Sequence, residues 1–568
     1  MQQPAPPSGN FDCAIALFSA GRFPEAESLC RDLLAAKPDP HVMHMLALIR
    51  ADAGAVDEAL GLLEQALATG VQHPAIHFAR GRVLLHLGRA TEALAPLRDS
   101  LRLDAHQPRV VAFLGKTLVN LGQIAEARDL LDASSAVFPG DADLREASGA
   151  AYMAAGRYEE ASRELERAIA GDPMLNEAYG NLAVVYEQLN RLDDTRRIID
   201  AGLARRPDHP ALRFVQARLQ RRDGDAAGAR SALEALRRTP GLAAHLDRDI
   251  EFELGWCADA LDETASAMAH FQSAKDKAIT LAAPALGLDE IFPRQMASLT
   301  RVYGSGAFPL LGAPQKPMPA FLLGFPRSGT TLLDTMLGAH PELWVMEEQP
   351  TVQAMLDSYL ASGLSYADDL IRLTPPQLAA IRAAHQRASR SAGWDGARGL
   401  IDKSPFATVH LGLIQQAYPA APVIFMARHP CDVVLSCFMN NFEINSGSVH
   451  FAKLGSAVTL YCGVMELWQL YLRRLALRHI VLRYEDLIVE PERELRRLLS
   501  FLDLPWSPKV LENSREALKR GRITTPSYHQ VSRPLYQDAR NRWRRYAKYL
   551  EPHLQRLRPH IEAFGYDA

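Results

Sequence analysis

The stretch FLLGFPRSGTTLLDTML, Phe321 to Leu337, decides the fold of the C-terminal half of the chain. It opens with a short apolar run that ends at Gly324, as a buried strand does, and it closes with a helical pattern that begins near Thr330. The turn between them holds a second glycine, Gly329. Backbone N–H groups in such a turn, together with the start of the following helix, attract a phosphate group. The stretch therefore predicts a strand, an anion-binding loop and a helix.

This loop lacks the lysine that is usual in phosphate loops. Against the pattern Gly-x-x-x-x-Gly-Lys-Ser/Thr, Gly329 is followed by Thr330 and Thr331. The missing lysine is the group that reaches the β- and γ-phosphates of a nucleoside triphosphate. Arg327, inside the loop, supplies a positive charge instead. The arrangement indicates a ligand with a single 5'-phosphate that bears one further anionic group.

Further short apolar runs alternate with helical stretches after this loop. Together with 320–324 they predict strands at 399–403, 422–427 and 480–484. Their continuous apolar character favours a mostly parallel sheet that is covered on both faces. Ligands of such sheets bind at the carboxyl ends of the strands. We therefore predict a C-terminal α/β domain of P-loop-like type.

A second anion site is predicted at the end of strand 422–427. A nucleoside triphosphatase would carry an acidic residue there to help hold magnesium, whereas this chain has Arg428. An arginine at that place indicates a second phosphate, and Ser436 on the following helix adds a hydroxyl group. Two separate phosphate sites, with no metal expected, describe 3'-phosphoadenosine 5'-phosphosulfate as the ligand.

The N-terminal half of the chain is repetitive. Related hexapeptides such as GRFPEA and GRYEEA recur every 33 or 34 residues, and they begin at Gly21, Gly54, Gly88, Gly122, Gly156, Asn190 and Gly224. Each Gly or Asn suits a turn between helices, and a small residue five positions later allows close helix packing. The pattern resembles tetratricopeptide repeats over residues 11–275, which implies an all-α solenoid. Its concave face either captures a peptide or protein segment or serves only as a scaffold.

The repeat pattern fades after Lys277, and the segment GSGAFPLLGAPQKPMP, Gly304 to Pro319, has the glycine and proline content of a linker. We therefore predict three parts of the chain. These are a repeat solenoid at 11–275, a linker at 276–318 and the α/β domain at 319–568.

Composition narrows the classes of partner and compartment. A chain of 568 residues is expected to hold more than one domain, and a net charge of -3 exerts no general attraction on nucleic acid or acidic membranes. The six cysteines lack metal-like pairing and favour reduced thiols. A basic leader and a run of eighteen apolar residues are both missing from the sequence. These features predict a cytoplasmic protein that binds neither nucleic acid nor membrane.

The two anion motifs together resemble those of sulfotransferases. GFPRSGTTLL is similar to their 5'-phosphosulfate loop, and IFMARHPCDVVLSCF is similar to their 3'-phosphate motif. Within that superfamily, GFPRSGTTLLDTMLGAHPELWVMEEQP resembles the tyrosylprotein sulfotransferases. The segments DKSPF, YEDL, SYHQVSRP and the pair Arg542–Trp543 extend the resemblance, which covers residues 319–568.

The resemblance implies a sulfotransferase that moves the sulfuryl group of 3'-phosphoadenosine 5'-phosphosulfate to an acceptor hydroxyl. Glu348 is then the base that takes the acceptor proton, while Arg327 and Lys403 neutralise charge as the bond to sulfur breaks. Glu347 is predicted to be structural. The residues implied in donor binding are Arg327, Ser328, Gly329, Thr330, Thr331, Arg428, Ser436, Tyr484, Ser527 and Arg542.

Other interpretations stay open at this level. The pair Glu347–Glu348 also suits a helix end, Lys403 also suits a surface position at the end of a strand, and His450 is a second candidate base. An atypical P-loop kinase and a non-catalytic repeat adaptor with a nucleotide-binding domain are the alternative functions. The acceptor also stays open between a tyrosine phenol in a peptide and hydroxyls of carbohydrates, lipids or small phenols.

Overall fold

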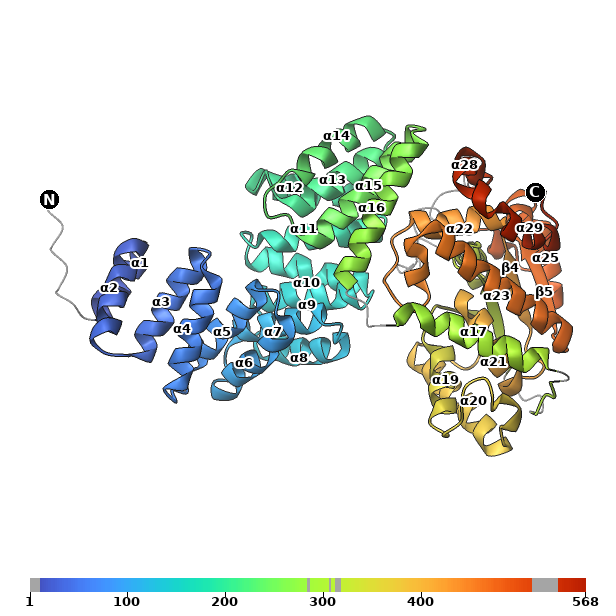
Figure 1. The fold of residues 1–568 in the computed structure, drawn as a ribbon, viewed down its shortest axis with the longest axis horizontal. Coiled ribbons are helices and arrows are strands. Elements are labelled where there is room, and N and C mark those ends of the chain that lie inside the picture. Colours follow the sequence, from blue (N-terminus) through green and yellow to red (C-terminus); the bar gives the residue numbers. More distant parts are fainter. Residues whose placement is uncertain (1–10, 283–286, 306–307, 312–317, 513–539, 568) are drawn as a thin grey trace. The chain divides into compact units, whose positions relative to one another are not determined.

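The computed structural model describes residues 11–282, 287–305, 308–311, 318–512 and 540–567. The chain divides into two compact units, Met1–Leu212 and Arg213–Ala568. The helices of the first unit follow one another as antiparallel pairs (Figure 1). They are α1 (Phe11–Ser19), α2 (Phe23–Ala36), α3 (Pro40–Asp52), α4 (Val56–Ala68), α5 (Pro74–His86), α6 (Ala90–Leu103), α7 (Pro108–Asn120), α8 (Ile124–Val137), α9 (Ala142–Ala154), α10 (Tyr158–Gly171), α11 (Asn176–Gln188) and α12 (Leu192–Arg205).

The repeat pattern of the sequence corresponds to these helix pairs. All seven predicted turn positions have positive φ angles: Gly21, Gly54, Gly88, Gly122, Gly156, Asn190 and Gly224. Within a pair the helices approach closely, because a Cβ atom added at Gly149 would lie 2.5 Å from Leu165 Cγ. Only glycine leaves room for that contact. The predicted all-α repeat array is therefore confirmed.

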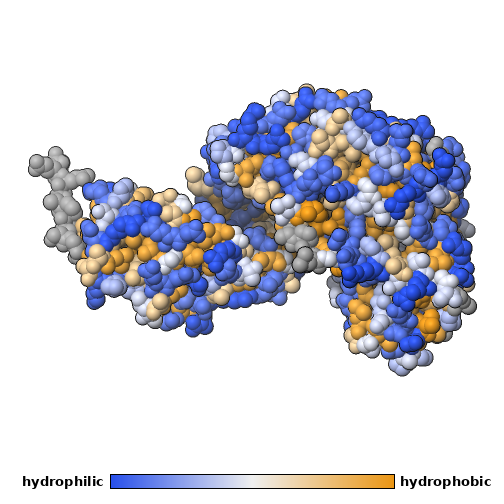
Figure 2. Space-filling view, in the orientation of Figure 1, coloured by the Kyte–Doolittle hydropathy of each residue, from blue (hydrophilic) through white to orange (hydrophobic). Residues whose placement is uncertain are grey.

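The surface of the repeats is mixed in character. On the face shown in Figure 2, hydrophobic residues lie among hydrophilic ones. Among the described residues of the first unit, the large apolar side chains that are exposed lie on different helices and turns, namely Ile15, Phe23, Val137 and Met174. Scattered apolar residues of this kind are ordinary on protein surfaces.

The second unit begins within α13 (Pro210–Arg222) and continues through four more helices before the sheet. These are α14 (Ala226–Arg237), α15 (Ala244–Ala260), α16 (Thr264–Ala282) and α17 (Leu288–Gly304). In α17, Phe292, Met296, Leu299 and Tyr303 are buried in the main hydrophobic core of this unit, because their spacing of three or four residues places them on one helix face. The segment predicted as a linker thus includes a packed helix, and the units divide at 212, ahead of the predicted boundaries at 275 and 319.

The sheet has five parallel strands in the order β2-β3-β1-β4-β5. They are β1 (Ala320–Gly324), β2 (Leu343–Glu347), β3 (Gly399–Lys403), β4 (Val423–Ala427) and β5 (His479–Arg483). The four strands predicted from sequence are present within one residue of their expected bounds. The edge strand β2 was missed, although its apolar run is as long as that of β1. The predicted parallel α/β domain is confirmed.

Both faces of the sheet are covered. Alternate residues of β1 belong to two different cores. Phe321 and Leu323 pack with α17 and with α23 (Leu454–Arg474), whereas Ala320 and Leu322 pack with α18 (Thr330–Gly338) and α25 (Pro491–Phe501). The remaining helices are α18 (Thr330–Gly338), α19 (Thr351–Leu360), η1 (Leu370–Arg372), α20 (Pro375–Ser391), η2 (Pro405–His410), α21 (Leu411–Ala417), α22 (Pro430–Met439), η3 (Ser448–Ala452), α23 (Leu454–Arg474), α24 (Tyr484–Val489), α25 (Pro491–Phe501), η4 (Pro508–Leu511), η5 (Arg542–Tyr546), α28 (Ala547–Leu550), η6 (Glu551–His553) and α29 (Leu554–Ala563). Among the described residues, no helix combines the length and apolar character that crossing a membrane requires.

Candidate active site

The loop between β1 and α18 depends on its two glycines. A Cβ atom at Gly324 would lie 2.7 Å from the carbonyl oxygen of Met426 on β4. At Gly329, where φ is 102°, it would lie 2.5 Å from the ring of Tyr484. The hydroxyl group of Thr408 holds Gly324 on both sides, since it accepts from the Gly324 N–H at 3.1 Å and donates to its carbonyl oxygen at 2.8 Å. Contacts with Met426, Tyr484 and Thr408 therefore fix the loop.

Polar groups that suit an anion line this loop. The Ser328 hydroxyl is buried and has no hydrogen-bond partner within the part of the chain that the structure describes. Thr330 and Thr331 are buried in the first turn of α18, and that turn carries no acidic residue. A buried hydroxyl without a partner calls for an explanation, and an anion at the positive end of a helix provides one.

Two buried arginines lie at this site, one inside the loop and one directly after β4. Arg327 and Arg428 are 9% and 8% exposed, and Arg428 Nη1 donates to the Arg327 carbonyl oxygen at 3.1 Å. Burial and the neighbouring charge of Arg428 lower the pKa of Arg327 to about 10. Guanidinium groups form charge-assisted, often bidentate hydrogen bonds with phosphate-like groups. The donor set therefore fits a ligand with more than one phosphate-like group.

The side chain of Arg327 is held by α22. Its Nε donates to Ser436 Oγ at 3.0 Å, and the amide of Asn440 donates to the Ser436 carbonyl oxygen at 2.8 Å. Arg327 also has a φ of 70°, in the left-handed region that a non-glycine residue rarely occupies. Residues in such conformations gather at functional sites, where the surrounding structure holds them.

Arg428 is positioned by groups on two further elements. Its guanidinium lies 4.9 Å from the centre of the Tyr484 ring, and its Nη2 is 4.0 Å from Asp432 Oδ2. The Asp432 oxygens accept from the backbone N–H groups of Asn541 and Trp543, each at 2.9 Å. The Asp432 carboxylate therefore links the Arg428 side chain to the C-terminal segment.

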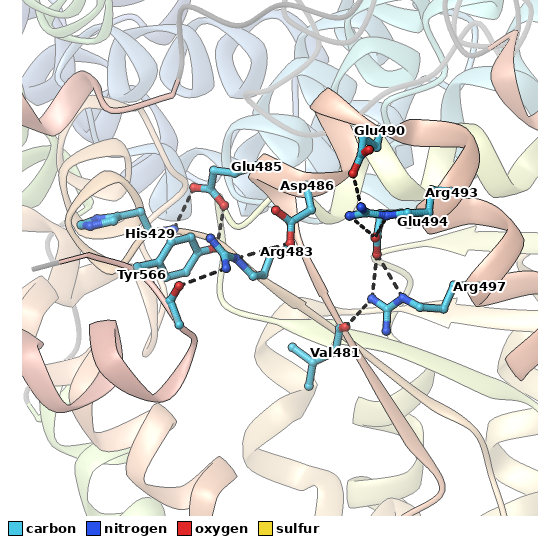
Figure 3. Close-up of polar contacts among 11 residues, drawn as sticks. His429, Val481, Arg483, Glu485, Asp486, Glu490, Arg493, Glu494, Arg497 and Tyr566 are labelled. Atoms are coloured by element: carbon cyan, nitrogen blue, oxygen red, sulfur yellow. Dashed lines mark hydrogen bonds and ion pairs between the residues drawn. The ribbon is translucent and has the colours of Figure 1, made fainter.

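A second layer of contacts fixes the turn after β4 (Figure 3). The Glu485 carboxylate accepts from the His429 backbone N–H at 3.0 Å and from the Tyr566 hydroxyl at 2.5 Å. Arg483 donates to the Gly565 carbonyl oxygen at 3.0 Å. Tyr566, near the C-terminus, therefore helps to hold the backbone that presents Arg428.

A separate cluster of charged groups lies where β2 and β3 end. Lys403 is fully buried, and its Nζ lies 2.8 Å from Glu348 Oε1, 3.4 Å from Glu347 Oε1 and 3.7 Å from Asp334 Oδ2. The register of the two strands pairs Glu347 with Lys403 directly. Although burial lowers the pKa of Lys403, the three carboxylates together raise it above its ordinary value. Lys403 is therefore charged, and it is not a surface lysine.

The two glutamates of the cluster differ. Burial raises the pKa of Glu347 to about 7, and the charges of Asp334 and Glu348 add to that increase while Lys403 opposes it. The Glu348 side chain is 40% exposed, and its backbone has a φ of 44°. The Glu348 N–H donates to the Lys403 carbonyl oxygen at 2.8 Å, which holds this unusual backbone in place. Glu348 thus faces solvent from a rigid position, whereas Glu347 is the more buried carboxyl group.

The remaining predicted residues are only partly accounted for. Arg542 begins η5, its guanidinium lies 5.4 Å from the centre of the Trp256 ring, and its charge contributes to the lowered pKa of Arg327. His450 lies in η3. Ser527 falls outside the described residues. The structure thus brings Arg327, Ser436, Arg428 and Tyr484 together, and it brings Glu348 and Lys403 together.

Sequence reasoning missed several members of the site. Asp334 was one of them, although it is the one charged residue of TTLLDTMLG, and a charge in a buried helix is a detectable signal. Asp432 and Glu485 act on the backbone of distant segments, and no local pattern reveals such contacts.

Comparisons with known proteins agree with this architecture. Residues 319–508 match the model of a sulfotransferase family, and residues 44–108, 87–151 and 152–219 match tetratricopeptide repeat models. Thus the C-terminal region belongs to the sulfotransferase family, and it follows a set of tetratricopeptide repeats.

Two relatives and one solved structure illustrate the range of similarity. An uncharacterised protein of Aquifex aeolicus is 32% identical over 263 residues, which are 43% of this chain and 33% of that protein. Protein-tyrosine sulfotransferase 1 of Danio rerio is 30% identical over 243 residues, which are 40% of this chain and 66% of the relative. The match thus spans less than two thirds of either relative. A tetratricopeptide repeat protein from Parabacteroides merdae is 16% identical with a TM-score of 0.38, over 43% of this chain and 96% of that one.

Proposed function

We propose that this protein is a sulfotransferase that moves the sulfuryl group of 3'-phosphoadenosine 5'-phosphosulfate to an acceptor hydroxyl. The observation that carries the proposal is the pair of buried arginines, Arg327 and Arg428, at the carboxyl ends of the adjacent strands β1 and β4. Guanidinium groups bind phosphate through charge-assisted hydrogen bonds, and a nucleotide with two separate phosphate-bearing groups offers one such group to each arginine. The family of the C-terminal region supports the same donor.

The donor is proposed to bind through the loop and through α22. Ser328, Gly329, Thr330 and Thr331 hold the 5'-phosphate through hydroxyl and backbone groups at the start of α18. Arg428 and Ser436 bind the 3'-phosphate. The other proposed donor contacts are Arg327, Tyr484, Ser527 and Arg542.

The transfer step is proposed to use Glu348 as the base. The acceptor hydroxyl loses its proton to Glu348, its oxygen forms a bond to sulfur, and the bond between sulfur and the 5'-phosphate oxygen breaks. Adenosine 3',5'-bisphosphate leaves with the electron pair of that bond. Arg327 and Lys403 stabilise the negative charge that develops on the bridging oxygen and the sulfuryl group. The partial exposure of Glu348 supports this role, because an acceptor must reach it from solvent.

A tyrosine phenol in a peptide is the acceptor that we propose to test first. The similarity to a protein-tyrosine sulfotransferase supports this class of acceptor. The repeats are proposed to hold the peptide or protein that carries the tyrosine, since concave repeat surfaces commonly bind extended segments.

Ligand-induced stabilisation of the full chain tests the donor. At a concentration of 100 times its Kd, adenosine 3',5'-bisphosphate is expected to stabilise the fold by about 2.7 kcal/mol, and ATP with magnesium by much less. Thermal unfolding measures both. A larger effect of ATP with magnesium would contradict the proposal and favour a kinase.

Transfer of labelled sulfate tests the reaction. The labelled donor is incubated with the protein and either a library of tyrosine-containing peptides or a set of small phenols. Label in the peptides is the expected result. Label only in small phenols would overturn the peptide acceptor, and nucleotide binding without any transfer would favour a non-catalytic adaptor.

A further inference from the structure

The helix pair α15–α16 shares a hydrophobic core with α22, the helix that holds Arg327. This shared core joins residues that the sequence assigned to the repeats and residues of the α/β domain. It is formed by Phe252, Ala258, Ala267, Phe271, Ala274, Leu435, Phe438, Met439 and Tyr546. Both groups belong to the same compact unit. The pair therefore packs as part of the domain that carries the candidate site.

One residue of this pair, Lys275, reaches the end of α22. Lys275 is 2% exposed, and its Nζ donates to the carbonyl oxygens of Cys437 at 3.2 Å and Asn440 at 2.7 Å. These are carbonyl groups of the last turn, where a helix carries partial negative charge. Lys275 Nζ also lies 5.6 Å from the centre of the Phe252 ring and 5.6 Å from the centre of the Phe442 ring. Burial lowers the pKa of Lys275 to about 7, a cost that the helix end and the two aromatic faces oppose.

The carbonyl groups that Lys275 binds are next to the groups that hold Arg327. Ser436, which accepts from Arg327 Nε, directly precedes Cys437 in the last turn of α22. Asn440, whose carbonyl oxygen binds Lys275, donates its side-chain amide to the Ser436 carbonyl oxygen. A displacement of this turn would therefore move the hydroxyl that orients the Arg327 guanidinium.

The same helix pair also anchors the segment that contains Arg542. Asp259, near the end of α15, accepts from the Tyr546 hydroxyl at 2.7 Å, and its carbonyl oxygen accepts from Arg545 at 2.6 Å. Trp256 lies against the Arg542 guanidinium. The helix pair α15–α16 thus contacts two parts of the candidate donor site, namely the last turn of α22 and the segment that contains Arg542.

We propose that α15–α16 forms part of the donor site and that Lys275 is a positioning residue for Arg327. Its hydrogen bonds lock the last turn of α22, so that Ser436 presents the Arg327 guanidinium to the anionic groups of the nucleotide. This inference rests on the proposed function for the identity of the nucleotide. It further implies that the α/β domain cut at residue 319, without α15–α16, binds the donor poorly.

The test compares Lys275→Met with Lys277→Met in the full chain. Lys277 lies on the same helix, but it pairs with Asp247 and Glu251 of α15 rather than with α22. Titration calorimetry with adenosine 3',5'-bisphosphate is expected to show at least a tenfold higher Kd for Lys275→Met and a change below twofold for Lys277→Met. The KM for the donor is expected to rise more than kcat falls.

Hydrogen exchange provides a readout that does not depend on the nucleotide. Backbone amides in the last turn of α22 are expected to exchange faster in Lys275→Met than in wild type and Lys277→Met. If Lys275→Met does not fold, Lys275→Gln, which keeps N–H donors, is expected to show a smaller change in the same direction. A folded variant with unchanged exchange and a Kd within twofold of wild type would overturn the proposal. Wild-type protein that does not bind the bisphosphate would instead overturn the proposed function, while the exchange comparison still tests the role of Lys275.

Discussion

The two ends of the candidate site differ in charge although they lie along the same edge of one sheet. Where β2 and β3 end, one lysine is surrounded by three carboxylates, those of Glu347, Glu348 and Asp334. Where β1 and β4 end, the guanidinium of the buried Arg428 donates to the backbone carbonyl oxygen of Arg327, which is also buried, and the nearby Asp432 accepts from backbone N–H groups. The first end holds more carboxylates than cations and retains a proton, whereas the second is built around two arginines, whose guanidinium groups suit an anion. This contrast is what a transfer from an anionic donor to a deprotonated hydroxyl requires.

The largest expected effect is on the rate of transfer, and it arises at the end of the site where Glu347, Glu348 and Asp334 surround Lys403. Glu348→Gln cannot accept a proton, so we expect transfer to fall by about 10²- to 10⁴-fold while the Kd for adenosine 3',5'-bisphosphate changes by less than about threefold. Single-turnover kinetics and calorimetry measure the two quantities. The exposed Glu342, close by in sequence, supplies the control substitution Glu342→Gln. Unchanged turnover in Glu348→Gln would remove Glu348 from the role of base.

The second effect concerns the proton on the Glu347 carboxyl group and the pH dependence of stability that it causes. The pKa of Glu347 is about 7 in the folded chain, above its ordinary value near 4.5, so its contribution to stability is full below pH 4.5 and is lost as the pH rises through 7. Since a shift of this size corresponds to about 3 kcal/mol, Glu347→Gln should gain up to that amount relative to wild type between pH 4.5 and pH 8.

Urea unfolding at several pH values, compared between Glu347→Gln and wild type, measures this difference. Titrating groups far from Glu347 cancel in the comparison, whereas Asp334, Glu348 and Lys403 are coupled to it and contribute to the measured difference. A difference in unfolding free energy that is independent of pH would show that Glu347 is ionised throughout, and the contrast in charge between the two ends would then be larger than the structure indicates.

The third effect is on nucleotide affinity, and it arises at the end of the site that holds Arg327 and Arg428. A charge-assisted hydrogen bond contributes about 1.5–3 kcal/mol, so Arg428→Ala should raise the Kd for adenosine 3',5'-bisphosphate by about 10- to 100-fold. The Kd for adenosine 5'-monophosphate should change much less, because that nucleotide lacks the group that Arg428 is proposed to bind. Arg478→Ala, at an exposed arginine paired with Asp503, is the control. Equal losses for both nucleotides would assign Arg428 to general support of the fold.

Much of the architecture follows from local sequence patterns. The seven repeat turns were predictable because a residue with positive φ and a small residue five positions later are local requirements of a helix hairpin. The loop at Gly324–Gly329 was predictable from the order of an apolar run, two glycines and a helical pattern, whereas the contacts with Met426 and Tyr484 that exclude a side chain at each glycine are tertiary. The edge strand β2 was missed, although the other edge strand, β5, is also incompletely buried and was predicted.

The sequence by itself thus determined the repeats, the strand–loop–helix unit and the identity of the candidate groups, because each depends on neighbours along the chain. Only the tertiary structure decided that Lys403 lies among three carboxylates, that α17 is packed in the core, and that Lys275 reaches α22 across 162 residues of sequence. The order of parallel strands and the docking of distant helices set these contacts. Such contacts depend on which apolar faces bury each other, and the pattern within any one segment does not specify its partner.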